Sequence, residues 1–230
     1  LLRLRKKYNL NILFDAAGAL GNPSLTTEEV FKYCDALTYS FNGNKIITTG
    51  GGGAVLTRNK KLFSSIKHLS TTARNYPDYE HDLIGFNYRL PNLNAALGLS
   101  QLEKLKTHIE RKREIYERVS EVVKSTKHWQ IIEHVEQESN YWLCALRYIG
   151  DIADLNSNLI GAFASRGITF SKFWQPIHKM QAYAGSDKIY LSDMPITYTC
   201  AASVFLVPCS ANILDHDLDL VTNSLREILT

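Results

Sequence analysis

The sequence has no apolar run that is long enough to cross a membrane as a helix. Its basic opening, residues 1–7, lacks the apolar core and the small-residue cleavage site of a leader peptide, so we interpret it as the end of an amphipathic helix. No C-x-x-C pair occurs, and we interpret the four cysteines as reduced core residues of a cytoplasmic protein: Cys34, Cys144, Cys200 and Cys209. The net charge of +3 is too small and too dispersed to indicate nucleic-acid binding.

Three further patterns are missing. The sequence has no internal repeat and no low-complexity segment. It also lacks G-x-x-x-x-G-K-[ST], because the run of four glycines at 50–53 follows Lys45 instead of preceding a lysine, and this excludes a nucleotide-binding P-loop. Four histidines share no spacing typical of metal ligands, so we expect no metal site at His81, His108, His128 or His134.

Helical and strand-like segments alternate in the first half, which favours an α/β fold with a largely parallel sheet. We expect strands at 11–15, 36–41 and 54–57, and helices at 1–8, 26–33 and 59–71. The strand at 11–15 is expected to be buried. Pro91 and Asn92 open a long helical region whose charged side chains, from 104 to 127, are interpreted as a solvated face.

A change of composition near 125–129 marks an expected domain boundary. We predict a large domain over 1–127 and a small α+β domain over 128–230. The small domain is expected to contain strands at 141–148, 168–173 and 204–207, and helices at 152–166 and 215–229, with Gly167 as a C-terminal cap.

One lysine and one aspartate stand where α/β folds place their sites, at strand ends. Lys45 lies in a polar turn after a strand, and Asp15 ends the strand before it. Taken singly, such a lysine is most often an exposed hairpin residue, and such an aspartate satisfies a local N–H. Together they suit pyridoxal phosphate, which needs a lysine amine for its Schiff base and an acid to keep its pyridine nitrogen protonated as an electron sink.

Four motifs in order resemble the DegT/DnrJ/StrS family of sugar-nucleotide aminotransferases, and most of all its branch that makes 4-amino sugars on the bacillosamine and legionaminic acid routes. They are DAAGALG at 15–21, SFNGNK at 40–45, TTGGGG at 48–53 and GFNYRLPNLNAALG at 85–98. The resemblance implies an aspartate-aminotransferase-like α/β large domain (fold type I), lacking an N-terminal segment that holds a phosphate-binding helix start and a ring-stacking aromatic, followed by a small α+β domain.

The resemblance also implies roles for single residues. Lys45 would carry the Schiff base and act as the catalytic proton carrier, and Asp15 would face the pyridine nitrogen. The Ser40 hydroxyl would bind the cofactor phosphate. Asn87 would reach the phosphate of a neighbouring subunit, which implies a homodimer with shared active sites.

Substrate contacts are implied at Tyr88, Arg89 and His178, each of which could equally be structural. Two positions depart from the family pattern. Gly18 stands where many relatives have Gln or His packed near the ring, and Gly51 replaces a common Glu. Glycine at 18 removes that contact and leaves open which side chain packs against the ring face.

The function implied is transfer of an amino group, from glutamate as the expected donor, to C4 of a 4-keto-6-deoxy nucleotide sugar. UDP-linked N-acetyl sugars fit the branch, and the product would enter cell-surface glycans. A dehydratase of the same family would carry histidine instead of Lys45. The alternative of another class is a non-catalytic family member that acts only by associating with partner subunits.

Overall fold

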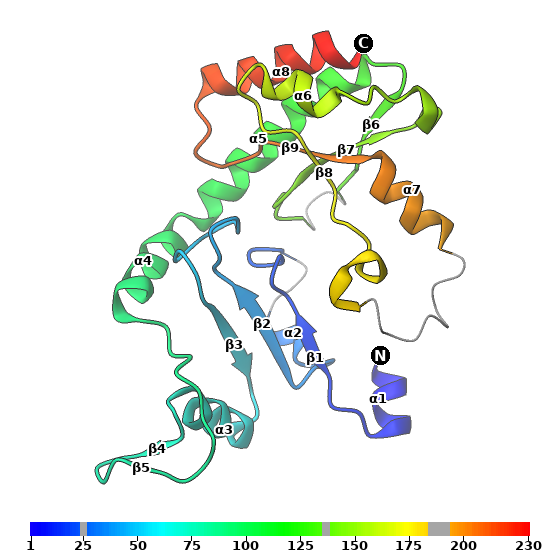
Figure 1. The fold of residues 1–230 in the computed structure, drawn as a ribbon. Coiled ribbons are helices and arrows are strands. Elements are labelled where there is room, and N and C mark those ends of the chain that lie inside the picture. The colour runs from blue at the N-terminus through cyan, green and yellow to red at the C-terminus, as the bar shows by residue number, and fades with distance from the viewer. Residues whose placement is uncertain (24–26, 135–138, 184–193) are drawn as a thin grey trace. The chain divides into compact units, whose positions relative to one another are not determined.

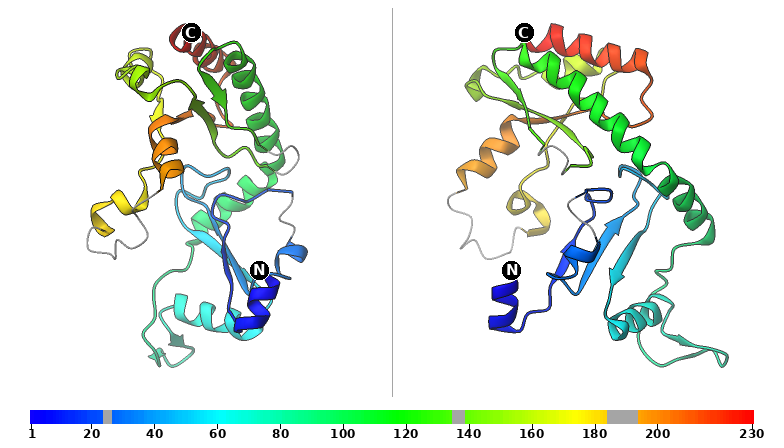
Figure 2. Two further views of the ribbon diagram at one scale, coloured as in Figure 1. Left: turned by 90° about the vertical axis from the view of Figure 1, so that its right-hand side faces the viewer. Right: turned by 180° about the vertical axis from the view of Figure 1, so that it is seen from behind.

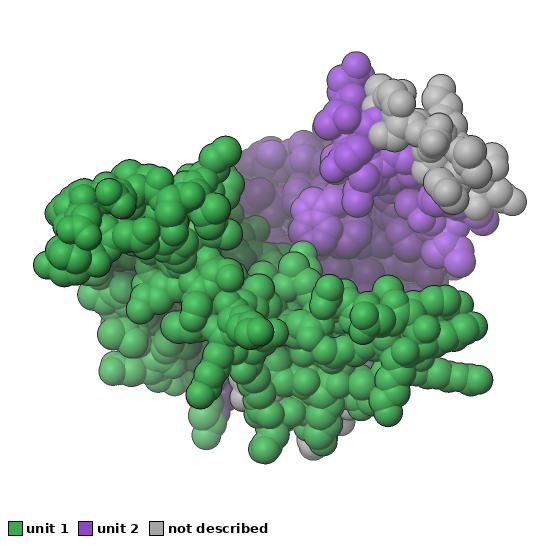
Figure 3. Space-filling view, turned by 90° about the horizontal axis from the view of Figure 1, so that it is seen from below, with its two compact units in different colours: residues 1–109, 136–142 green, residues 110–135, 143–230 purple. Residues whose placement is uncertain are grey.

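The computed structural model describes residues 1–23, 27–134, 139–183 and 194–230. Packing divides the chain into two compact units, coloured separately in Figure 3. Unit 1 comprises 1–109 and 136–142, and unit 2 comprises 110–135 and 143–230. Unit 1 therefore ends at Ile109 in its first segment and also contains residues 139–142. The predicted boundary between the domains lies after Lys127 instead. The predicted domain organisation stays a prediction.

Unit 1 is built on a three-stranded sheet in the order β1-β2-β3. Strand β1 (Leu13–Asp15) runs parallel to β2 (Ala36–Ser40), and β2 runs antiparallel to β3 (Gly53–Thr57) (Figure 1). The predicted strands are confirmed within two residues, but the sheet is only half parallel, because the turn after β2 folds β3 directly back along it. The predicted burial of the first strand is wrong, since Leu13 is 65% exposed.

Short helices and a hairpin complete unit 1. They are α1 (Leu2–Tyr8), α2 (Thr27–Val30), α3 (Lys60–Ser70), the hairpin β4 (Arg74–Asn75) with β5 (Glu80–His81), and α4 (Asn92–Glu103). The Asn59 side chain accepts the N–H groups of Lys61 and Leu62, which satisfies two of the free donors that begin α3. The predicted helix 59–71 is confirmed to within one residue at each end. Thr26, the first residue of the predicted helix 26–33, lies outside the described residues.

Unit 2 contains a four-stranded antiparallel sheet in the order β6-β7-β9-β8. Its strands are β6 (Trp129–Ile131), β7 (Cys144–Tyr148), β9 (Val204–Val207) and β8 (Ser171–Lys172). Its helices are α5 (Leu105–Lys124), which begins in unit 1, α6 (Leu159–Ala164), α7 (Pro195–Ser203) and α8 (Asp215–Leu229), with short 3₁₀ turns η1 (Ile152–Asp154), η2 (Ile177–Lys179) and η3 (Gln181–Tyr183).

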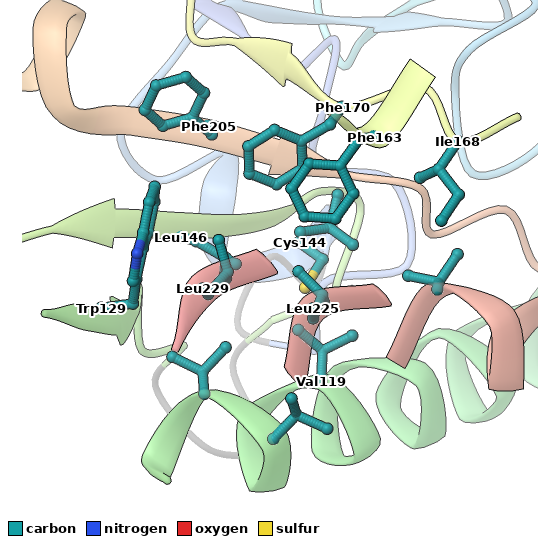
Figure 4. Close-up of a cluster of buried hydrophobic side chains, with 14 of the residues drawn as sticks. Val119, Trp129, Cys144, Leu146, Phe163, Ile168, Phe170, Phe205, Leu225 and Leu229 are labelled. Atoms are coloured by element: carbon teal, nitrogen blue, oxygen red, sulfur yellow. The ribbon is translucent and has the colours of Figure 1, made fainter. Parts of the chain in front are cut away.

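The core of unit 2 lies between its sheet and helices α5, α6 and α8 (Figure 4). Phe163 of α6 stacks on Phe170 with ring centroids 4.3 Å apart, and Phe170 stacks on Phe205 of β9 at 5.3 Å. The stacked rings bury a large apolar area away from water, the main stabilising term in folding. Helix α8 was predicted with its bounds, and its buried residues include Leu218, Val221 and Leu225.

Three predicted elements of unit 2 are shorter than expected. Strand 141–148 begins only at Cys144, because Tyr141 has a φ of 53° that an extended strand excludes. The predicted helix 152–166 is split into η1 and α6, and Gly167 follows with a φ of 74°, as its predicted role requires. The strand at 168–173 is reduced to β8.

One charge on α5 is not solvated. Lys112 is 6% exposed, and its Nζ donates a 2.6 Å hydrogen bond to the Cys209 carbonyl oxygen. Cys34 and Cys144 are buried as predicted, Cys200 and Cys209 are partly buried, and none of the described cysteines forms a disulfide. None of the helices within the described residues is both long enough and apolar enough to cross a membrane.

Candidate active site

The carboxyl ends of β1 and β2 bring three predicted site residues to one edge of the sheet. The two strands are parallel, with Asp15 opposite Thr38, so they end side by side. Ser40 is the last residue of β2, and the turn that carries Lys45 follows it. Crevices at such strand ends are where α/β folds place their ligands. The local sequence order therefore concentrates an amine, a carboxylate and a hydroxyl.

The turn between β2 and β3 is held by its own backbone. Lys45 N–H donates to the Asn42 carbonyl at 3.0 Å, and Thr49 N–H donates to the Phe41 carbonyl at 2.9 Å. Gly53 lies so close to β2 that a Cβ there would stand 2.3 Å from the Tyr39 carbonyl oxygen. The missing side chain at Gly53 therefore allows the backbone of β3 to approach the backbone of β2 closely.

Asp15 and Ser40 both use one oxygen for local turns. The Ala17 N–H donates to Asp15 Oδ1 at 3.0 Å, and the Asn42 N–H donates to Ser40 Oγ at 3.3 Å. Asp15 is exposed, so its carboxylate keeps acceptor capacity on its second oxygen. Ser40 keeps its own hydroxyl hydrogen as a donor. Asp15 therefore does accept a hydrogen bond from a local N–H, the structural role given above for a single aspartate. Its second oxygen can still accept a hydrogen bond from another partner.

Lys45 is half-buried, and its surroundings change its proton affinity. Burial lowers the pKa of the Lys45 ammonium, and the negative charge of Asp15 acts in the opposite direction. Lys45 Nζ also lies 3.6 Å from the ring centroid of Trp142. An amine with a lowered pKa is neutral, and therefore nucleophilic and basic, in a larger fraction of molecules near neutral pH.

Trp142 belongs to a segment that sequence reasoning did not assign to the site. The segment 139–142 packs within unit 1. Trp142 Nε1 donates to the Asn44 carbonyl at 2.7 Å across 98 residues of sequence. No periodicity or spacing links positions so far apart. Tyr141, the residue before Trp142, has a positive φ, but this backbone conformation cannot be inferred from a tyrosine in the sequence.

Asn140 fastens the same segment to the loop after Asp15. Its Nδ2 donates to the carbonyls of Gly18 at 2.8 Å and Leu20 at 2.9 Å, and its Oδ1 accepts the Trp142 N–H at 3.0 Å. Asn140 is 6% exposed, so these bonds replace those that water would make. Trp142 fills the space beside Gly18, where a Cβ would lie 2.7 Å from the indole.

The electrostatic link between Asp15 and Lys45 gives a prediction with a definite sign. The carboxylate favours the ammonium form, so Asp15→Asn is expected to lower the pKa of Lys45 further. Acetylation of Lys45 in the purified chain, followed by peptide mass across a pH series, measures the midpoint. Asp78→Asn, an exposed change in the β4–β5 hairpin, is the matched control. An unchanged or raised midpoint in Asp15→Asn would contradict the link.

Asn87, Tyr88 and Arg89 lie elsewhere in unit 1. Asn87 forms an isolated antiparallel β-bridge with Thr71, the residue after α3. Asn87, Tyr88 and Arg89 are all exposed. The rings of Phe86 and Tyr88 stack with centroids 5.0 Å apart. Helix α3 lies at the end of the sheet away from the Lys45 turn (Figure 1, Figure 2). The structure therefore does not bring Asn87 to Lys45 within one chain.

His178 lies in unit 2, in the 3₁₀ turn η2. Its Nε2 lies 2.9 Å from the Tyr198 hydroxyl oxygen, and the two rings meet edge to face with centroids 5.3 Å apart. This contact gives the histidine a structural partner. Its predicted contact with substrate stays a prediction.

A model of the DegT/DnrJ/EryC1/StrS aminotransferase family matches residues 1–226. The GDP-perosamine synthase of Caulobacter vibrioides is 27% identical over 233 residues, which cover 100% of this chain and 62% of that protein. The GDP-perosamine synthase of Escherichia coli O157:H7 is 33% identical over 188 residues, which cover 80% of this chain and 50% of that protein. The chain therefore spans 50% to 62% of the length of these curated relatives.

Solved structures share the fold. Helicobacter pylori PseC, an aminotransferase involved in the biosynthesis of pseudoaminic acid, superposes with a TM-score of 0.83 at 22% identity, covering 99% of this chain and 62% of PseC. DesI, solved in the presence of its TDP-sugar product, superposes with a TM-score of 0.82 at 23% identity, covering 98% and 57%. The predicted α/β fold of the aspartate-aminotransferase-like type is confirmed.

Proposed function

Because the chain belongs to the DegT/DnrJ/EryC1/StrS aminotransferase family, we propose that it uses pyridoxal phosphate to transfer an amino group to a nucleotide sugar. The amino donor would be glutamate and the acceptor the C4 keto group of a 4-keto-6-deoxy nucleotide sugar. Glutamate leaves as 2-oxoglutarate, and the sugar gains the amino group at C4. The product would be an amino sugar for cell-surface glycans, made in the cytoplasm.

The observation that carries the proposal is the state of Lys45. Its amine is half-buried, has a lowered pKa, and stands at the strand edge that also bears Asp15 and Ser40. These three groups fit pyridoxal phosphate chemically: an amine for its aldehyde, a carboxylate for its pyridine nitrogen and a hydroxyl donor for its phosphate. When bound, pyridoxal phosphate supplies an electron sink for the carbon that loses or gains the amino group.

The residues of the chain would divide the work. Lys45 Nζ would hold the cofactor covalently and, once released, would remove a proton from the α-carbon of glutamate. In the second half of the reaction, the same Nζ would deliver a proton to C4 of the sugar. Asp15 would keep the pyridine nitrogen protonated, and Ser40 would orient the phosphate. A positioned group that moves protons in this way contributes roughly 10²- to 10⁴-fold to a rate.

The names of the relatives support the acceptor class. They include a UDP-4-amino-4,6-dideoxy-N-acetyl-β-L-altrosamine transaminase of Campylobacter jejuni and a dTDP-4-amino-4,6-dideoxy-D-glucose transaminase of Shigella dysenteriae. Both names contain a 4-amino-4,6-dideoxy sugar on a nucleotide. The exposure of Asn87, at the end of the sheet away from Lys45, suits a homodimer in which Asn87 serves the partner's phosphate. Tyr88, Arg89 and His178 are proposed substrate contacts.

Borohydride trapping tests the proposal directly. The purified chain is mixed with pyridoxal phosphate, reduced and digested, and the modified peptide is identified by mass. We expect a phosphopyridoxyl group on Lys45, because its amine is neutral more readily than an ordinary lysine and stands beside Asp15.

The controls separate this site from chance labelling. Lys45→Arg should abolish the label, whereas Lys60→Arg, at the exposed start of α3, should leave it unchanged. Label scattered over surface lysines, or no label at all, would contradict the proposal. That outcome would support the alternative of a non-catalytic family member that acts by associating with other subunits.

A further inference from the structure

We propose that Trp142 is the positioning residue of Lys45, and that Gly18 lacks a side chain so that the Trp142 indole can lie there. This inference rests on the proposed function, in which Lys45 is the reacting amine. It adds a third segment of chain, 139–142, to a site otherwise made by two strand ends and a turn.

The first observation is the contact between ring and amine. Lys45 Nζ lies 3.6 Å from the centroid of the Trp142 ring. Tryptophan has the most favourable aromatic face for a cation, and the attraction is larger where water is excluded. The ring is fixed at the same time, because its Nε1 donates to the carbonyl of Asn44, the residue directly before Lys45. One side chain thus holds both the backbone and the amine of the reacting residue.

The second observation is the fit against Gly18. A Cβ at this position would lie 2.7 Å from Cε3 and Cζ3 of Trp142, well inside the roughly 3.5–4.0 Å of ordinary carbon contact. Gly18 does not have a φ in the left-handed region, unlike Gly21 at 78°. The backbone conformation alone would therefore admit alanine. What excludes a side chain at Gly18 is the indole ring.

The third observation is how firmly the segment is anchored. Asn140 is buried, and both of its amide hydrogens are used on the carbonyls of Gly18 and Leu20, while its Oδ1 accepts the Trp142 N–H. The indole is therefore held between the loop after Asp15 and the turn of Lys45. A ring fixed from both sides can restrict the Lys45 side chain and exclude water from one side of its Nζ.

The two effects of the Trp142 ring shift the protonation equilibrium of the Lys45 amine in opposite directions. Exclusion of water favours the neutral amine, and the ring face favours the ammonium. Trp142→Leu keeps an apolar side chain and removes the aromatic face, so the midpoint of Lys45 acetylation should fall by about 0.5 to 1 on the pH scale. Trp142→Phe keeps an aromatic face and should restore most of the difference. A ring that only packs would give the same midpoint in all three chains.

A double-mutant cycle tests the pairing with Gly18. The readout is again the acetylation midpoint of Lys45 in the chain without cofactor. Gly18→Ala should displace the indole and move the midpoint to that of Trp142→Ala, and adding Gly18→Ala to Trp142→Ala should move it no further. Equal shifts in both backgrounds would overturn the pairing. If Gly18→Ala does not fold, the comparison of Leu with Phe at 142 decides the role of the ring.

Trp174→Leu is the control for loss of a tryptophan as such, since Trp174 is 54% exposed in unit 2. It should leave the midpoint of Lys45 unchanged. None of these measurements needs pyridoxal phosphate. Failure of borohydride trapping would therefore contradict the proposed function alone, and a midpoint unaffected by Trp142→Leu would contradict this inference alone.

Discussion

Lys45→Arg is expected to lower the rate of amino transfer by about 10⁴-fold, the upper end of what a positioned proton carrier contributes. Arginine keeps the positive charge over the Trp142 ring, and its guanidinium stacks on aromatic faces, so the fold should be retained. What it loses is the primary amine, and with it the covalent hold on the cofactor. Arginine also stays charged at any working pH, so it cannot act as a base.

The measurement is the rate of the reaction between glutamate and a 4-keto-6-deoxy nucleotide sugar, followed by formation of 2-oxoglutarate. Lys60→Arg is the matched control and should keep the full rate, because Lys60 is exposed at the start of α3. The unfolding midpoint of Lys45→Arg should stay close to that of the unchanged chain. A variant that folds and retains a tenth of the rate or more would contradict the assignment of Lys45.

Asn140→Asp is expected to destabilise unit 1 by about 3–5 kcal/mol at neutral pH, the range for leaving an uncompensated buried charge. The substitution changes the shape of the side chain very little. It replaces the two N–H donors that bind the Gly18 and Leu20 carbonyls with an oxygen that can only accept, and it buries a negative charge among carbonyl dipoles. Loss of this anchor should also loosen Trp142.

Chemical denaturation measures the effect, and its pH dependence has a definite sign. Burial among carbonyls should raise the pKa of the introduced carboxyl above its unfolded value of about 3.9. The native variant then binds more protons than the unfolded one above that value, so its stability falls as pH rises. The deficit against the unchanged chain should be smallest near pH 4 and grow toward neutral pH.

Asn59→Asp provides the same substitution where it should be harmless. Asn59 is exposed, and its Oδ1 only accepts hydrogen bonds, from the N–H groups of Lys61 and Leu62, so an aspartate there can cap α3 equally well. Its free energy of unfolding should change by less than about 0.5 kcal/mol. Similar losses in both variants would show that Asn140 has no special role as an anchor.

The parts of the site that lie near one another in sequence were predictable. Asp15 ends one strand and Lys45 follows the next, and a helix lies between the two strands. Strands joined in this way run parallel, so their carboxyl ends meet at the same edge of the sheet. Glycine has one physical property, the absence of a Cβ, that acts wherever backbones meet, and at Gly53 this property lets β3 approach β2.

Burial and strand direction were harder to predict. The apolar residues of 11–15 predicted a buried strand, but Leu13 is exposed. Apolar side chains contribute much of the surface of folded proteins, so an apolar residue does not by itself show that its position is buried. The largely parallel sheet was inferred from alternating elements. The segment 41–52 between β2 and β3 contains no helix that would cross over the sheet, and β3 returns beside β2 as an antiparallel strand.

The sequence by itself determined the family, the fold class, and the amine and carboxylate at the strand ends, because these depend on local order and on motifs read within a few residues. Only the tertiary structure decided what surrounds Lys45. Trp142 and Asn140 reach the site from 98 and 122 residues away from their partners Asn44 and Gly18. Contacts between such distant positions depend on tertiary packing, which leaves no periodicity or spacing in the sequence. The sequence therefore showed only that Gly18 has no side chain, and the structure showed that the Trp142 indole occupies the space beside it.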